Sequence, residues 1–374
     1  MESAGTLSRF RLVTGADEPD LFEAALSISA LIDPAEDLDA ARESVASLAA
    51  RVRRRGTSET LQGELRRVMF EEEGFRGDAD DYDSPSHSSV ARVIATRRGM
   101  PITLSLVTLE VGRLSGLRLT GVGLPGHFVV GGPDLPEGMF LDPFDGGALY
   151  DAEGISRRLG EIFGSPVTLS REALAPDPPR AILRRVLLNL RRSYERRDRW
   201  EEALAALEFA EALDPDHLAH RRERGLLLLK CGRTEDAIAA LEDYAAGAEG
   251  EDAEAIERLL TVIRGQADAE ILDTPAERKI FTLDEARALL PRVQELTEEA
   301  ATRFGSLGGA LEGERQEVVR DWMTRLRALG LEIKGLWLVD FDSGAGYYCW
   351  KYPEPSLNHF HGYDEGFAGR LALQ

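Results

Sequence analysis

A period of 34 residues in the middle of the chain constrains its fold more than any other feature. Ala203 and Leu207 recur as Ala237 and Leu241, and a spacing of about 34 residues is the length of one tetratricopeptide repeat. Each such repeat is a pair of helices that packs against its neighbours in a stack. The period therefore predicts a solenoid of helical hairpins in this part of the chain.

The two repeats match the pattern unequally. The first carries the large, small and terminating residues that the pattern requires, namely Leu187, Leu190, Tyr194, Ala203, Ala210 and Pro215. The second keeps Gly225 and Gly232, but Arg221 and Arg224 stand at usually apolar positions and the closing proline is missing. We expect two repeats and a capping helix over residues 252–266, since a solenoid needs a polar outer face at its end.

Composition narrows the class of protein. The chain has 374 residues, too many for one ordinary core, and its 45 Lys and Arg against 66 Asp and Glu give a net charge of −21. Such a charge repels a phosphate backbone, so nucleic acid is not an expected partner. No segment resembles a signal peptide or a membrane span. The two cysteines, Cys231 and Cys349, are too few for a disulfide framework, so we expect a soluble protein of the reducing cytoplasm.

Changes in sequence texture divide the chain into three predicted domains. Their ranges are 1–178, 179–270 and 271–374. An acidic and then Pro-containing stretch separates the last two and is typical of a linker. The expected fold class is a multidomain α+β protein with a helical opening, an α+β core, an all-α repeat region and a small α+β domain.

The first domain changes from helical to mixed structure along its length. Apolar residues recur with helical spacing over residues 19–72, and a turn-rich stretch begins at Gly74. Pro101 is suited to the first turn of a further helix that Gly116 ends. Short apolar segments punctuated by Gly, Pro and Asp follow between residues 117 and 144, and they predict an antiparallel meander packed on that helix.

The third domain begins with a helix signal and ends with strands. Thr282 and Glu285 have capping-box spacing, and Pro291 inside the following helix predicts a kink or a break. A second helix is expected from about Glu312 to Leu329. The segments LWLVDF and YYCWKY flank the turn sequence DSGAG, so the pattern predicts a helical hairpin followed by a β-hairpin.

His127 and Asp142 are candidates for two members of a nucleophilic triad. They lie fifteen residues apart on neighbouring predicted strands and can face each other across a hairpin. Papain-like chemistry needs, in addition, a thiolate at a helix N-terminus, where the helix dipole lowers the thiol pKa. The helix that begins at GMPIT is the natural place for that nucleophile.

The runs RRGMPITLS, LPGHF and LDPF, in that order, are motifs that the chain shares with a known family. Over roughly residues 20–266 the chain resembles the bacterial SirB-type transglutaminase-like proteins with C-terminal tetratricopeptide repeats. The resemblance implies a papain-like or transglutaminase-like core in which His127 and Asp142 occupy the family's His and Asp positions. It also implies that the nucleophile position falls near Thr103, a hydroxyl residue rather than a cysteine.

The residue at the nucleophile position decides the expected chemistry. A cysteine thiol is readily ionised by a helix end or a histidine, whereas the hydroxyl of Thr103 needs a strong general base. Thr103 has no terminal amine of its own to act as that base. We therefore expect no enzyme activity and no cofactor, and we interpret His127, Asp142 and Thr103 as a vestigial triad of a pseudoenzyme. A hydrolase or acyltransferase with Thr103 or Cys349 as nucleophile is the alternative.

Each of these residues also has a plain structural interpretation. A histidine beside Phe128 and Val129 is often a core residue with one hydrogen bond, and Asp142 before a proline is typical of an Asx turn. Thr103 can be a helix N-terminal residue whose side chain bonds a free amide, which is the interpretation that we prefer for it.

The first repeat helix is rich in arginine although the chain as a whole is acidic. Its arginines include Arg184, Arg185, Arg191 and Arg192. Guanidinium groups recognise carboxylates, so this helix and the repeat groove are candidate sites for a protein or acidic peptide, or for the acidic N-terminal domain itself. The alternative is a helix face that pairs with acids of its own chain.

The third domain carries a cysteine and two histidines on its predicted strands. Cys349, His359 and His361 are candidate zinc ligands or a thiolate–imidazolium pair, because i, i+2 spacing places both histidines on one strand face. The alternative is an aromatic core with polar edges. Residues 280–372 also resemble a small bacterial family of uncharacterised domains, whose motif falls on Trp350, His361, Glu365 and Arg370 and carries no known activity.

The sequence thus leads to one preferred function and two alternatives. The preferred function is that of a non-catalytic transglutaminase-like protein with tetratricopeptide repeats, acting as a cytoplasmic adaptor or regulator. The alternatives are an acyl-transfer enzyme with an atypical nucleophile and a metal-binding C-terminal domain.

Overall fold

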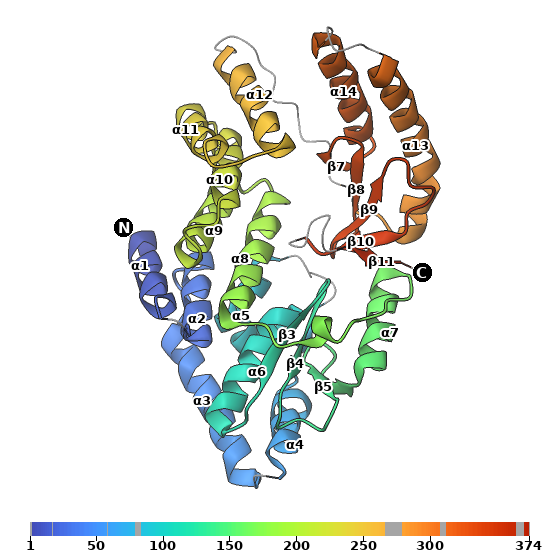
Figure 1. Cartoon of the computed structure of the whole chain (residues 1–374). Coiled ribbons are helices and arrows are strands. Elements are labelled where there is room, and N and C mark those ends of the chain that lie inside the picture. Colours follow the sequence, from blue (N-terminus) through green and yellow to red (C-terminus); the bar gives the residue numbers. More distant parts are fainter. Residues whose placement is uncertain are drawn as a thin grey trace. The chain divides into compact units, whose positions relative to one another are not determined.

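The chain folds into helices and small, mainly antiparallel sheets that group into two compact units (Figure 1). The computed structural model describes residues 2–16, 18–57, 59–78, 84–265, 279–306, 312–363 and 370–373. The first unit comprises residues 1–152 and 170–268, and the second comprises residues 153–169 and 269–374. The expected multidomain α+β class is confirmed. The expected linker near residue 270 lies outside the described residues.

Helices form most of the first unit ahead of its sheet. They are α1 (Glu2–Thr14), α2 (Leu21–Ile32), α3 (Leu38–Arg55), α4 (Leu61–Arg66), α5 (Val90–Thr96) and α6 (Pro101–Ser115), with a π-helical turn η1 (Arg67–Glu72) and a 3-10 turn η2 (Pro85–Ser88). Side-chain caps define several starts: the carboxylate of Asp20 accepts from the amide of Glu23 at 3.0 Å. The expected helical opening over residues 19–72 is confirmed.

Helix α6 is the central element of this unit. It begins with Pro101 and ends at Gly116, whose φ of 94° is the left-handed conformation that glycine adopts without strain. Both predicted ends are therefore confirmed. Twelve of its fifteen residues are buried because α3 covers one side and the sheet covers another.

The sheet packed on α6 is a four-stranded antiparallel meander. Its strands are β3 (Thr120–Leu124), β4 (His127–Gly131), β5 (Phe140–Asp142) and β6 (Ala148–Tyr150), in the order β3-β4-β5-β6. Two short strands, β1 (Arg76–Gly77) and β2 (Arg98–Gly99), pair in parallel near the start of α6. The predicted meander is confirmed, and β6 extends it by one strand.

The repeat region consists of consecutive antiparallel helix pairs and a last helix. Its helices are α8 (Pro179–Glu195), α9 (Trp200–Leu213), α10 (Ala219–Lys230), α11 (Thr234–Ala245) and α12 (Glu251–Gly265), preceded by the short turn η3 (Glu172–Leu174). The recurring residues Ala203, Leu207, Ala237 and Leu241 are each 0 % exposed. The 34-residue period thus marks the buried contacts between paired helices.

The repeats share one hydrophobic core with the helices and sheet that precede them. Buried residues form a continuous cluster from Phe10 on α1 to Ala237 on α11. The rings of Phe10 and Phe209 lie 4.9 Å apart between centroids, so α1 packs directly on α9. The predicted division at residue 178 separates two folds by sequence pattern, but no break in the apolar core accompanies it.

The second unit combines three helices with a five-stranded antiparallel sheet. Its elements are α7 (Ala152–Phe163), α13 (Leu283–Ser306), α14 (Glu312–Arg327), β7 (Glu332–Gly335), β8 (Leu338–Asp342), β9 (Tyr347–Lys351), β10 (His359–His361) and β11 (Leu371–Ala372). The strand order is β11-β10-β9-β8-β7. Helix α7 belongs here because the ring of Phe163 stacks on Phe360, with centroids 4.1 Å apart.

Two sequence predictions for α13 have different outcomes. The capping box is confirmed, since Glu285 accepts from the amide of Thr282 at 2.9 Å and Thr282 accepts from the amide of Glu285 at 3.3 Å. The break at Pro291 is wrong, because the helix continues through it. Buried residues on both sides, including Leu290 and Val293, outweigh the cost of one missing hydrogen bond. Among the described helices, none is long and apolar enough to cross a membrane.

Candidate functional site

His127 and Asp142 form a buried pair on the four-stranded sheet. The imidazole Nε2 of His127 donates a hydrogen bond to Asp142 Oδ2 at 2.8 Å, and the two residues are 5 % and 1 % exposed. The carboxylate only accepts, so Nε2 carries the proton and Nδ1 is left as the basic nitrogen. The structure thus brings together two of the three residues that the sequence named.

Strand pairing explains why these two side chains meet. Val130 on β4 lies opposite Leu141 on β5, so Asp142 lies opposite Val129. Side chains alternate along a strand, which places His127 on the same face as Val129 and diagonal to Asp142. This diagonal distance is within the reach of an imidazole and a carboxylate.

Asp142 also organises the turn that follows it. Its second oxygen, Oδ1, accepts hydrogen bonds from the amides of Phe144 at 3.0 Å and Asp145 at 3.2 Å. The ring of Phe144 meets the His127 imidazole edge to face at 6.0 Å between centroids. Gly77 is needed beside this ring, because a Cβ there would lie 2.4 Å from Phe144 Cε2. Asp142 therefore combines the Asx turn expected as its structural alternative with the histidine pairing.

Thr103 lies on α6 with its hydroxyl directed at main-chain oxygens. The hydroxyl donates to the carbonyl of His87 at 2.7 Å and to that of Met100 at 3.1 Å, and the residue is 0 % exposed. The sequence interpretation of a side chain that bonds a free amide is wrong on this point. The neighbouring η2 turn presents a carbonyl to this position, so the hydroxyl acts as a donor.

His87 is a second buried histidine near the start of α6 that the sequence analysis did not single out. Its Nε2 lies 3.5 Å from Asp78 Oδ2, and its Nδ1 has no hydrogen-bond partner within the described part of the chain. The main chain of the same residue receives the Thr103 hydroxyl. The stretch DSPSHSS has the composition of a turn, and a histidine among turn-forming residues is the one feature by which the sequence could have indicated a site there.

The arginines of α8 are engaged within the chain. Arg185 donates from Nη2 to the carbonyl oxygens of Leu124 and, at 3.0 Å, His127, so it holds the turn between β3 and β4. Arg184 pairs with Asp214 at 3.1 Å. Arg191 is 8 % exposed and pairs with Glu195 and Glu223, and Arg192 is not free either. The interpretation of a helix that binds its own chain describes these contacts.

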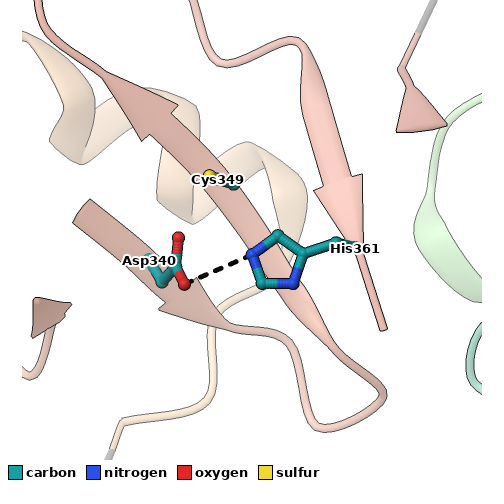
Figure 2. Close-up of side chains that lie close together, drawn as sticks. All are labelled: Asp340, Cys349 and His361. Carbon is teal, nitrogen blue, oxygen red and sulfur yellow. Dashed lines mark ion pairs between the residues drawn. The ribbon is translucent and has the colours of Figure 1, made fainter. Parts of the chain in front are cut away.

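Asp340, Cys349 and His361 form a buried cluster in the second unit (Figure 2). They come from β8, β9 and β10, and their ligand atoms all lie within 4.8 Å of one another. Asp340 Oδ2 is 3.3 Å from His361 Nε2, while His361 Nδ1 is 2.9 Å from the carbonyl of Gly362. Burial lowers the pKa of His361, but the facing carboxylate of Asp340 outweighs burial and raises it overall.

Cys349 lacks the surroundings of a reactive thiolate. It is 0 % exposed, and burial together with the nearby Asp340 carboxylate raises its thiol pKa strongly. Low pKa and solvent access are what a cysteine nucleophile needs. Cys231, the other free cysteine, is half-buried at the end of α10, and burial raises its pKa as well.

His359 is held by a different set of residues. Arg370 Nη2 lies 2.7 Å from its Nδ1, and Arg370 also pairs with Glu354 at 2.8 Å. His359 is therefore not part of the buried cluster.

Asp340 belongs to the cluster with Cys349 and His361, although the sequence analysis did not name it. Asp340 is the direct cross-strand neighbour of Cys349, and the sequence indicated the hairpin but not the register that pairs these two residues. Glu365 lies outside the described residues.

Three known families match consecutive parts of the chain. The transglutaminase-like superfamily matches residues 39–188, a tetratricopeptide repeat family matches residues 190–261, and an uncharacterised conserved protein family, DUF2203, matches residues 309–373. The resemblances stated from the sequence are confirmed.

Curated relatives match about half of the chain. UPF0162 protein PA3419 of Pseudomonas aeruginosa is 34 % identical over 200 residues, which are 52 % of this chain and 71 % of that protein. A UPF0162 protein of Xylella fastidiosa is 35 % identical over 183 residues, 48 % of this chain, and the match spans 65 % of the relative's length. A crystal structure of menin matches with a TM-score of 0.34 and 11 % identity, over 86 % of this chain and 82 % of that one.

Proposed function

We propose, on the premise that the chain belongs to the UPF0162 family, that it is a non-catalytic transglutaminase-like protein whose tetratricopeptide repeats bind a protein or peptide. It would act as an adaptor or regulator. The His127–Asp142 pair then has a structural role, and the repeats supply the binding function.

The contacts of Thr103 are the observation that carries the non-catalytic part. A nucleophilic hydroxyl must give its proton to a base that it touches. Both hydrogen bonds of the Thr103 hydroxyl go to main-chain carbonyl oxygens, which cannot take up a proton at neutral pH. The hydroxyl is also fully buried, which separates it from a substrate. These contacts support a hydroxyl that fixes η2 to α6 and does not attack.

The alternative nucleophile Cys349 is disfavoured by its own environment. Its burial and raised pKa keep the thiol protonated and inaccessible. A buried thiol of this kind can still bind a metal ion, because coordination removes its proton.

The repeats support the binding part because stacked helical hairpins present extended surfaces for peptides and helices. The arginines of α8 are occupied within the chain, so we assign the binding surface to the later helices of the stack. Leu226 on α10 is a large apolar residue that is 37 % exposed there. Both cysteines are free, and we place this function in the reducing cytoplasm.

Point substitutions test this proposal better than deletion of the repeats, since deletion would expose the shared core. The experiment captures binding proteins from the native cell on immobilised full-length chain and compares Leu226→Glu with Leu12→Glu, whose leucine is 80 % exposed on α1. We expect the first substitution to abolish capture of a specific protein and the second to leave it unchanged.

The catalytic alternative makes a distinct prediction in the same preparation. An acyl-donor probe is incubated with the wild-type chain and with Thr103→Val, and covalent adducts are mapped by mass spectrometry. The proposal expects no adduct at residue 103 and unchanged capture of binding proteins by Thr103→Val. An adduct at Thr103 that disappears in Thr103→Val would overturn the non-catalytic assignment.

A further inference from the structure

The middle of the five-stranded sheet gathers three different kinds of metal-binding atom. Figure 2 shows the side chains of Asp340, Cys349 and His361 close together on three neighbouring strands, with the carboxylate of Asp340 and the imidazole of His361 facing each other. Their residues are 0 %, 0 % and 3 % exposed. An oxygen, a sulfur and a nitrogen from three strands are therefore enclosed together.

The register of the paired strands β8, β9 and β10 brings these three side chains together, and no loop residue is involved. Asp340 lies opposite Cys349 across β8 and β9, and Cys349 lies opposite His359 across β9 and β10. His361 is two residues further along β10, so its side chain is on the same face as that of His359. The cluster is thus built on paired strands, which position ligand atoms more rigidly than loops do.

The hydrogen bond of His361 presents its other nitrogen as a ligand. Nδ1 lies 2.9 Å from the carbonyl of Gly362, and a carbonyl can only accept, so Nδ1 carries a proton. Nε2 is then the nitrogen that faces Asp340 at 3.3 Å. A histidine whose second nitrogen donates to a main-chain carbonyl is the usual arrangement around a bound metal.

The Asp340 carboxylate lacks the hydrogen bonds that a buried charge needs. Neither of its oxygens has a hydrogen-bond partner within the described ranges, and the side chain is fully buried. Its one ion-pair contact there is with His361 Nε2. A buried carboxylate without well-formed hydrogen bonds is costly, and a positive charge beside it, either a proton on His361 or a metal ion, offsets that cost.

We propose that Asp340, Cys349 and His361 form a zinc site in the C-terminal unit. Mg²⁺ and Ca²⁺ bind oxygen ligands and do not select sulfur, whereas zinc accepts carboxylate, thiolate and imidazole together. Zinc bonds of about 2.0–2.3 Å place tetrahedral ligand atoms about 3.3–3.8 Å apart. From separations within 4.8 Å, the side chains reach that geometry by moving inward by about 1 Å.

Charge and proton balance are consistent with this ion. A thiolate and a carboxylate neutralise the two positive charges of zinc, so the occupied site has no net charge to bury. Binding displaces the thiol proton of Cys349 and, where present, the Nε2 proton of His361 to solvent. Three protein ligands leave one tetrahedral position for a water molecule or a further ligand. The site is independent of the proposed binding function, because it lies in the other compact unit.

Metal content of the full-length chain is the direct test. Protein stripped with a chelator is reloaded with Zn²⁺, freed of excess ion and analysed by atomic mass spectrometry, and a parallel sample is titrated with Co²⁺. We expect stoichiometric zinc and, with Co²⁺, the near-ultraviolet absorption of a thiolate–cobalt bond. A chain that retains no zinc and gives no such absorption would contain only a proton between Asp340 and His361, and the proposal would be overturned.

Matched variants identify the ligands. Cys349→Ala replaces the sulfur ligand by a small apolar side chain. We expect it to abolish the cobalt–thiolate absorption and to weaken zinc binding more than about tenfold. Cys231→Ala and His359→Gln are the controls and should bind as the wild type does. Zinc should raise the melting temperature of the wild type but not that of Cys349→Ala. Equal binding by Cys349→Ala and Cys231→Ala would place any bound ion elsewhere and refute the site.

Discussion

Two buried histidine–carboxylate pairs on antiparallel sheets differ in how the carboxylate is satisfied. Asp142 receives His127 at 2.8 Å on one oxygen and two main-chain amides on the other. Asp340 faces His361 Nε2 at 3.3 Å and the nearby Cys349 thiol, and neither of its oxygens has a hydrogen-bond partner of good geometry among the described residues. The comparison shows that a histidine–aspartate pair has a purely structural role when hydrogen bonds satisfy both carboxylate oxygens. When they do not, the carboxylate remains able to bind a further cation.

The largest expected effect is the difference between isosteric substitutions of the two aspartates. Asp142→Asn weakens one buried and two partly buried hydrogen bonds to a carboxylate, and we expect it to lower the free energy of unfolding by about 2–4 kcal/mol. Asp340→Asn, without zinc, removes a poorly satisfied charge and should change it by less than about 1 kcal/mol. Urea denaturation followed by circular dichroism measures both. Equal losses would remove the distinction between the pairs.

Glu223 on α10 is a third carboxylate for this comparison, and it is stabilised by ion pairs with Arg191 and His220. Burial raises its pKa, but the imidazole of His220 and the guanidinium of Arg191 outweigh burial and lower the pKa from 4.5 to about 2. Because the folded-state pKa is depressed, the stabilisation is present above pH 4.5 and is lost as the pH falls toward 2. Glu223→Gln should cost about 1–3 kcal/mol at pH 7, with the difference from wild type vanishing near pH 2 in urea titrations.

Thr103→Val tests the buried hydroxyl at the start of α6 in the same unit as the His127–Asp142 pair. The substitution keeps the shape of the side chain and leaves the carbonyl of His87 without its hydroxyl donor, so we expect a loss of about 1 kcal/mol in the same denaturation experiment. A loss above about 3 kcal/mol would indicate that the hydroxyl has a role beyond these two hydrogen bonds.

His359→Gln should have the smallest effect. Its glutamine oxygen can still accept from Arg370, so the free energy of unfolding should change by less than about 0.5 kcal/mol, and the zinc content should be unchanged. A loss of zinc in this variant would show that His359 belongs to the metal site together with Asp340, Cys349 and His361.

Sequence reasoning succeeded where local chemistry determines the structure. Pro101 and Gly116 delimit α6 through their own backbone preferences, and the capping box fixes the start of α13. The pairing of His127 with Asp142 followed from two apolar segments joined by a turn. In each case the deciding residues are close in sequence, and their preferences agree with the packing.

Sequence reasoning was less complete where register or tertiary packing decides. Asp340 became a neighbour of Cys349 only through the register of β8 and β9, which the turn sequence alone did not define. Pro291 was expected to kink or break α13, but the helix is not broken, because residues on both sides of Pro291 pack in the core. The hydroxyl of Thr103 found its carbonyl because η2, a turn without periodicity, passes over the start of α6.

Arg185 couples the first repeat helix to the strand that carries His127. Its guanidinium on α8 donates hydrogen bonds to the carbonyl oxygens of residues 124 and 127, and α8 also contributes buried residues to the core that begins at Phe10. A ligand that displaced the repeat helices would therefore also displace the turn between β3 and β4. Nicking the backbone between residues 164 and 178 should accordingly yield two pieces that still migrate as one particle.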